Sequence, residues 1–81
     1  MSLVTGPQLR AARAMAGIDQ ETLAKSAGVT ANTVRRLEGM KGRLRATTTT
    51  VDALQKALEQ AGVEFFGGDQ PGVKMRSPSA A

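Results

Sequence analysis

The stretch from residue 19 to residue 39 constrains the fold most strongly, because its start and stop signals leave room for two short helices joined by a tight turn. Asp19 can accept a hydrogen bond from a backbone N–H of the following turn, which is how a helix N-cap residue acts. Gly28 ends this helix, since glycine adopts a left-handed backbone without steric cost. Thr30 caps the next helix, and Gly39 ends it. The pattern predicts a helix-turn-helix unit with helices over residues 20–27 and about 30–38.

A further helix is predicted on the N-terminal side of this unit, from Thr5 to Ala16. Thr5 can cap it, and Pro7 suits its first turn, where the missing N–H of proline has no helical partner to lose. Gly17 follows as the C-terminal stop.

The threonine run at residues 47–50 precedes a fourth predicted helix, which Gly62 ends. One of these threonines caps the helix, and Thr49 with Asp52 resembles a capping box that uses Asp in place of Glu. The predicted helix carries an apolar face at helical spacing. Its members are Val51, Leu54, Ala57, Leu58 and Ala61.

The C-terminal part changes character and predicts two short strands, residues 63–66 and 73–76, around a turn rich in glycine. An isolated hairpin is marginally stable in water, so this one must pack on the helices or pair with another chain. We therefore expect a mainly α fold: four helices with a short C-terminal β-hairpin or strand pair. The predicted divisions are a helix-turn-helix domain over residues 1–62, a β tail for packing or dimerisation over 63–76, and a disordered end over 77–81.

The composition excludes several kinds of chemistry. The chain has neither Cys nor His, which excludes disulfides, Cys/His zinc sites, thiol nucleophiles and imidazole acid–base catalysis. The acidic residues are scattered and form no catalytic pair, so we expect no enzymatic activity, no cofactor and no metal. No apolar run approaches the roughly 20 residues that span a bilayer, and the N-terminus lacks the layout of a signal peptide. The expected location is cytoplasmic.

Positive charge is concentrated after the predicted turn. The 81 residues carry 11 Lys and Arg against 7 Asp and Glu, a formal net charge of +4. Five cations fall within eleven residues, and Glu38 is the only acid among them. Such a stretch is a candidate phosphate-binding surface, and its alternative interpretation is a solvated loop without a partner. The five are Arg35, Arg36, Lys41, Arg43 and Arg45.

Residues 20–38 show the most specific spacing in the chain. The pattern is Gln20-x-x-Leu23-Ala24-x-x-x-Gly28-Val29-Thr30-x-x-x-Val34-x-x-Leu37-Glu38. Four apolar positions, Leu23, Ala24, Val34 and Leu37, lock the two helices together, and Ala24 is small where the helices approach closely. The arrangement resembles the lambda-repressor/Cro-like, or XRE, family of helix-turn-helix regulators over about residues 8–61, roughly two thirds of the chain. The tail also resembles that of small bacterial XRE proteins that end in a Gly-Val-Glu-Phe segment and a short basic strand.

This resemblance implies a lambda-repressor-like fold whose domain over residues 1–62 binds DNA, in a bacterial or phage-like setting where the protein is nucleoid-associated when bound. Early exposed positions of the third helix face base edges in the major groove, and these are Ala31, Asn32, Thr33 and Arg36. Asn pairs with adenine and Arg with guanine, while small methyl groups touch thymine. The expected phosphate contacts are Gln20, Thr30, Arg35, Lys41, Arg43 and Arg45. Ala31 departs from several relatives, which carry a long polar side chain at this position.

The family often pairs an Arg of the first helix with the Glu that ends the third helix. Arg13 and Glu38 occupy the matching positions, so the resemblance implies a structural ion pair between them.

The function expected from these residues is sequence-specific binding of double-stranded DNA by a transcriptional regulator, most simply a repressor. Such proteins usually read two half-sites about 34 Å apart as homodimers. The dimer surface is either the strand edge of the β tail or an apolar strip near the fourth helix that uses Leu58, Val63, Phe65 or Phe66. The alternative for the strip is that the Phe side chains finish the core, as we expect of at least one of them. Two alternatives remain: an antitoxin that binds both DNA and a toxin or other protein partner, and a protein-interaction module that keeps the fold without DNA binding. A membrane-binding role is not expected.

Overall fold

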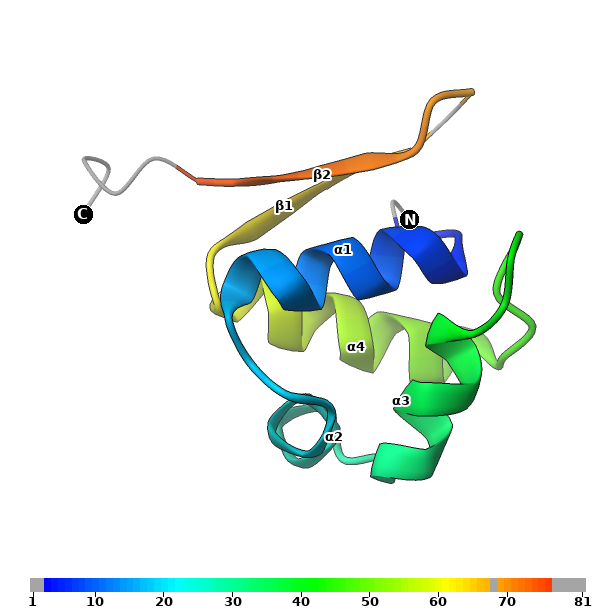
Figure 1. Cartoon of the computed structure of the whole chain (residues 1–81), viewed down its shortest axis with the longest axis vertical. Helices are drawn as coiled ribbons and strands as arrows, with labels where there is room; N and C mark the ends of the chain where they lie inside the picture. Colours follow the sequence, from blue (N-terminus) through cyan, green and yellow to red (C-terminus); the bar gives the residue numbers. More distant parts are fainter. Residues whose placement is uncertain (1–2, 68, 77–81) are drawn as a thin grey trace.

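The computed structural model describes residues 3–67 and 69–76. Four helices form the body of the molecule, and an antiparallel two-stranded sheet lies along one side of it (Figure 1). The mainly α fold with a C-terminal strand pair is thereby confirmed. In chain order the elements are α1 Gly6–Ala16, α2 Gln20–Ala27, α3 Ala31–Glu38, α4 Thr48–Gln60, β1 Val63–Phe66 and β2 Gly72–Met75. The predicted end at residues 77–81 lies outside the described residues.

The first three helices begin and end where the local signals predict. The hydroxyls of Thr5 and Thr30 accept hydrogen bonds from the backbone N–H three residues later, and the Asp19 carboxylate does the same. Gly17 and Gly28 follow α1 and α2 with φ angles of 71° and 74°. These angles lie in the left-handed region that glycine adopts without penalty.

The start of α4 differs from the prediction. Thr47 is the N-cap, and its hydroxyl accepts a hydrogen bond of 3.2 Å from the Thr50 N–H. Thr49 already lies inside the first turn, so the predicted capping box between Thr49 and Asp52 is wrong. All four threonines are chemically competent caps. The choice among them depends on where the preceding loop leaves the chain in an extended conformation.

One hydrophobic core unites the helices with the sheet. The four positions expected to lock α2 against α3, Leu23, Ala24, Val34 and Leu37, are 3 % exposed or less. Leu9 and Ala12 of α1 and Leu54 and Leu58 of α4 complete the centre. Val63 and Phe65 of β1 join the same cluster, because alternate residues of a strand face one side.

The sheet is held to α1 through a buried amide. Gln8 is 4 % exposed, and its Nε2 donates to the Phe66 carbonyl at 2.9 Å and to the Gly72 carbonyl at 3.1 Å. Phe66 and Gly72 pair at the loop end of the hairpin. The second strand runs from Gly72 to Met75, so it begins and ends one residue earlier than the predicted strand at residues 73–76.

The packing of β1 corrects one proposed dimer surface. Leu58, Val63 and Phe65 are 0 %, 1 % and 9 % exposed, so they belong to the core and cannot form the apolar strip of an interface. Phe66 alone of the four is exposed, at 44 %. Strand alternation explains the difference, since Phe66 points to the opposite face from Phe65.

The capping assignment of α4 makes a direct prediction. Thr47→Ala removes the acceptor for the Thr50 N–H and should lower the free energy of unfolding by roughly 0.5–2 kcal/mol. Thr49→Ala is the matched control, because Thr49 is exposed and caps nothing. Urea denaturation of both variants measures the difference. An equal loss in the two variants would contradict the assignment.

Candidate nucleic-acid interface

One face of α3 is buried in the core, and the residues on its opposite face are exposed to solvent. Val34, Leu37 and Glu38 are buried, whereas Asn32, Arg35 and Arg36 are exposed. With about 100° of rotation per residue, Asn32 and Arg36 lie about 40° apart and point almost directly away from Val34. Arg35 projects to one side of this direction. Two side chains with base-reading chemistry therefore stand next to each other on a helix whose inner face is fixed in the core.

The other two predicted base-reading residues occupy the flanks of α3. Ala31 is half-buried and packs against the core cluster. Thr33 is also half-buried, and its hydroxyl hydrogen-bonds the Thr30 hydroxyl at 2.9 Å. The Asn32 Oδ1 accepts from Arg35 Nη1 at 3.3 Å. The first turn of α3 is thus internally hydrogen-bonded. Of the four predicted base-reading residues, only Asn32 and Arg36 are exposed.

A charged network joins three helices behind this face. Arg13 of α1 donates to Glu38 at the end of α3, with 2.6 Å from Nε to Oε2 and 3.1 Å from Nη2 to Oε1. The Glu38 side chain is 6 % exposed and that of Arg13 21 %. The hydrogen bond to Glu38 raises the pKa of Arg13 above its usual value, although partial burial of the guanidinium acts in the opposite direction. The guanidinium therefore stays charged at any physiological pH.

The same network includes Gln20, for which the sequence predicted only a phosphate contact. Its Nε2 donates to Glu38 Oε1 at 3.2 Å, and Arg13 Nη1 donates to the Ile18 carbonyl at 3.0 Å. Gln20 is the first residue of α2, so the network fixes the amino end of α2 relative to α3. No periodicity in the sequence signals this contact, because it depends on the angle between the two helices.

The N-cap of α2 carries a titratable group. The Asp19 carboxylate accepts a hydrogen bond of 2.7 Å from the Thr22 N–H. This bond lowers the pKa of Asp19 below its usual value of 3.8, since it stabilises the ionised form.

The basic loop, residues 40–46, follows α3 and turns back toward α4 (Figure 1). Lys41, Arg43 and Arg45 are all exposed. Backbone hydrogen bonds tie the loop to the segment before α1: Leu44 N–H donates to the Val4 carbonyl at 2.8 Å, and Gly6 N–H donates to the Gly42 carbonyl at 3.1 Å. Sequence reasoning missed this attachment, because a single β-bridge leaves no alternating pattern.

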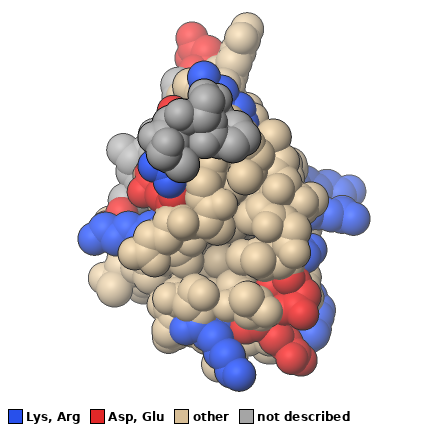
Figure 2. Space-filling model, turned by 90° about the vertical axis from the view of Figure 1, so that its left-hand side faces the viewer, with Lys and Arg blue, Asp and Glu red and all other residues tan. Residues whose placement is uncertain are grey.

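The side of the molecule turned away from α3 has a different character. Figure 2 shows a broad uncharged centre on that face, with Lys, Arg and acidic side chains toward its margins. A polyanion needs cations across its contact surface. The centre of this face offers no such cations, whereas α3 and the basic loop carry exposed Lys and Arg side chains.

Two short helices, α2 and α3, are joined by a turn at Gly28, and the second of them has a face exposed to solvent. This arrangement defines a helix-turn-helix protein. The chain belongs to the helix-turn-helix domain family, whose model matches residues 6–65. The match extends from α1 into β1, so it includes the whole helical body. DNA binding is the activity that this family membership implies. Comparison with the curated proteins gives no match.

Within the described part of the chain, no helix has the length and apolarity that a membrane crossing requires. Residues 3–67 and 69–76 also contain no group of three or more acidic side chains placed to hold a metal ion.

The buried network predicts that replacing Arg13 lowers the free energy of unfolding much more than replacing Arg10, another arginine of α1. Arg13→Met leaves the buried Glu38 carboxylate without its cation and should lower the free energy of unfolding by about 2–3 kcal/mol. Arg10→Met is the control: Arg10 is exposed, and a change there should cost no more than about 0.5 kcal/mol. Chemical denaturation at neutral pH measures both. A similar loss of unfolding free energy in the two variants would show that the Arg13–Glu38 ion pair does not stabilise the fold.

The Asp19 cap predicts a defined pH dependence. Because its pKa is lower in the folded chain, the cap contributes stability above about pH 4 and loses that contribution as the pH falls through the folded value. Asp19→Asn retains a capping side chain but cannot titrate. The stability difference between wild type and this variant should therefore shrink between about pH 7 and about pH 2.5, as measured by thermal unfolding. A difference that stays constant would refute this role of Asp19.

Proposed function

We propose that the chain is a sequence-specific regulator of transcription, of the XRE type, that reads the major groove of double-stranded DNA with α3. The observation that carries this proposal is the pairing of exposed Asn32 and Arg36 on the outer face of a helix anchored by Val34 and Leu37. A helix held rigidly from behind presents its outer side chains in fixed positions, which base readout requires.

The chemistry of the two outward side chains suggests which bases they prefer. The Asn32 amide combines a donor with an acceptor and matches the N7 and N6 groups of adenine. The Arg36 guanidinium presents two parallel donors and matches O6 and N7 of guanine. The part-buried Ala31 and Thr33 have methyl groups suited to a thymine methyl at the edge of the contact.

Phosphate contacts would surround this centre and set the overall affinity. Gln20, half-buried at the start of α2, suits one phosphate, because a helix N-terminus favours anions. The remaining candidates are Thr30, Arg35, Lys41, Arg43 and Arg45, all of which are exposed. Each phosphate neutralised by a cation releases counterions, so binding should weaken steeply with salt.

A homodimer is part of the proposal. One reading helix covers only a few base pairs, and two copies would read half-sites about 34 Å apart. Exposed Met15, Phe66 and Met75, each more than 40 % exposed, and the uncharged face in Figure 2 are suited to protein contact rather than to DNA. Bound at a promoter in the cytoplasm, such a dimer would repress by excluding polymerase.

Selection of bound DNA from a random duplex pool tests the proposal. A palindromic winner with half-sites about one helical turn apart, and with affinity that falls as salt rises, is the expected result. Failure to enrich any sequence with folded protein would overturn it. An antitoxin or a protein-interaction module would then be the better account, and a protein partner the next object of search.

The division between reading and anchoring residues can be tested on the selected sequence. Arg36→Ala should weaken binding by roughly 1–3 kcal/mol and relax the preference at one base position. Arg43→Ala should instead weaken binding evenly across sequences and reduce the salt slope by about 1. Titrations of both variants against the selected site and single-base variants of it measure these effects. The division is wrong if the two variants give the same pattern.

A further inference from the structure

The first turn of α1 lies against the start of the basic loop, with no space for a side chain at Gly6. A Cβ atom placed there would lie 2.0 Å from the Met40 carbonyl oxygen and 2.8 Å from that of Leu37. Gly6 is not among the glycines with positive φ, so the requirement is for space and not for an unusual backbone angle. Both obstructing atoms are backbone, which cannot rotate away as a flexible side chain would.

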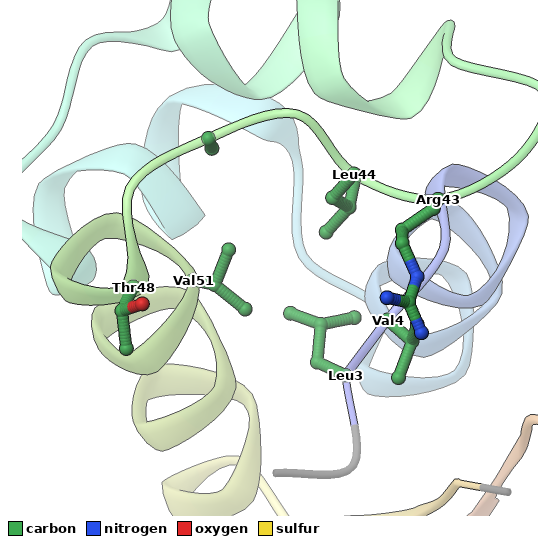
Figure 3. A pocket seen from close by; sticks show the side chains of 7 residues that line it. Leu3, Val4, Arg43, Leu44, Thr48 and Val51 are labelled. Atoms are coloured by element: carbon green, nitrogen blue, oxygen red, sulfur yellow. The ribbon is translucent and has the colours of Figure 1, made fainter.

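This close approach forms part of a wider attachment, which we call the brace: residues 3–6 joined to residues 42–44. Two backbone hydrogen bonds, Gly6 N–H to Gly42 and Leu44 N–H to Val4, flank an antiparallel bridge between Thr5 and Arg43. Figure 3 shows the Arg43 side chain lying beside Val4, with Leu3 and Leu44 facing the same shallow hollow.

The N-terminal half of the brace is itself fixed to the body of the protein. Leu3 is 2 % exposed, and its N–H donates to Gln55 Oε1 of α4 at 3.0 Å. Val4 N–H donates to Gln8 Oε1 of α1 at 2.7 Å. The loop is therefore bonded to a segment that two helices hold in place, although the loop contains a glycine and three exposed cations.

We propose that Gly6 is a positioning residue for DNA binding: by admitting the brace, it holds the basic loop where its cations meet phosphates beside α3. The inference rests on the proposed function and adds a determinant of affinity that does not itself touch DNA. A loop already ordered in the free protein loses little conformational entropy on binding, so its cations contribute more to affinity. In the proposed function α3 sets the base preference, so we expect the brace to change affinity and not base preference.

The test begins with Gly6→Ala, in which the new methyl group must displace the Met40 carbonyl. We expect the affinity for the selected duplex to fall by about tenfold and the salt slope to decrease by about 1–3, since each phosphate that is no longer neutralised lowers the slope by about 1. The order of preference among single-base variants of the site should stay the same. Gly39→Ala is the matched control, because its φ is −77° and the nearest atoms to a Cβ there are 3.6 Å away. It should bind like wild type.

A double-mutant cycle separates positioning from simple loss of folded protein. If the brace acts through the loop cations, Arg43→Ala should weaken binding clearly in the wild-type background and much less in the Gly6→Ala background. Titrations are made below the thermal transition of each variant. If Arg43→Ala weakens binding by the same factor in both backgrounds, the positioning role is overturned.

Amide hydrogen exchange of the free protein tests the brace without DNA. The Leu44 amide should exchange slowly in wild type and in Gly39→Ala but rapidly in Gly6→Ala, with the core amides of Leu54 and Leu58 protected in all three. Unchanged Leu44 protection in Gly6→Ala would overturn the inference. If the wild-type chain selects no DNA, the proposed function fails as well. If the wild-type chain selects a DNA sequence and Gly6→Ala binds it equally well, the positioning role of Gly6 is refuted while the proposed function stands.

Discussion

The contact between Glu38 and Arg13 is the constraint on which the position of α3 depends. Glu38 ends α3 with its carboxylate almost fully buried, and Arg13 of α1 neutralises it through two hydrogen bonds. Gln20 binds the same carboxylate from the start of α2. A buried carboxylate is costly unless its oxygens are satisfied. The orientation of three helices is therefore coupled to one group, and helices that pack differently would leave it unpaired.

The outward face of α3 follows from this arrangement together with the apolar core. Val34 and Leu37 fix the inner side of the helix, and the network fixes its C-terminal end, so Asn32 and Arg36 are left facing solvent. The amino end of α2 is set by the same carboxylate. Asn32, Arg36 and the amino end of α2 are consequently held at a fixed spacing on one surface.

A second polar centre, Gln8, attaches the sheet and the N-terminal segment to the helices. Its amide oxygen accepts from Val4 and Thr5, and its nitrogen donates to the carbonyls of Phe66 and Gly72. A two-stranded hairpin has too little surface to be stable alone. Its docking on α1 through this amide, with Val63 and Phe65 in the core, makes it part of the helical domain.

The sequence by itself determined the first three helices, their ends and the outward positions of Asn32 and Arg36 on α3. These depend on caps, glycines and apolar spacing within a few residues of one another, as at Asp19, Gly28 and Thr30. It also indicated the pairing of Arg13 with Glu38, although through the resemblance to a family and not through local chemistry. It misplaced the cap of α4, because four adjacent threonines are equivalent in isolation.

Only the tertiary structure decided the contacts between segments far apart in the chain. The bond of Gln20 to Glu38, the amide bonds of Gln8 to the hairpin and the close approach of Gly6 to Met40 depend on how the helices cross. The tertiary packing also places Val63 and Phe65 in the core and not in an interface. Local propensity fixes which residues share a face of one element, whereas burial and hydrogen bonding between elements fix what that face meets.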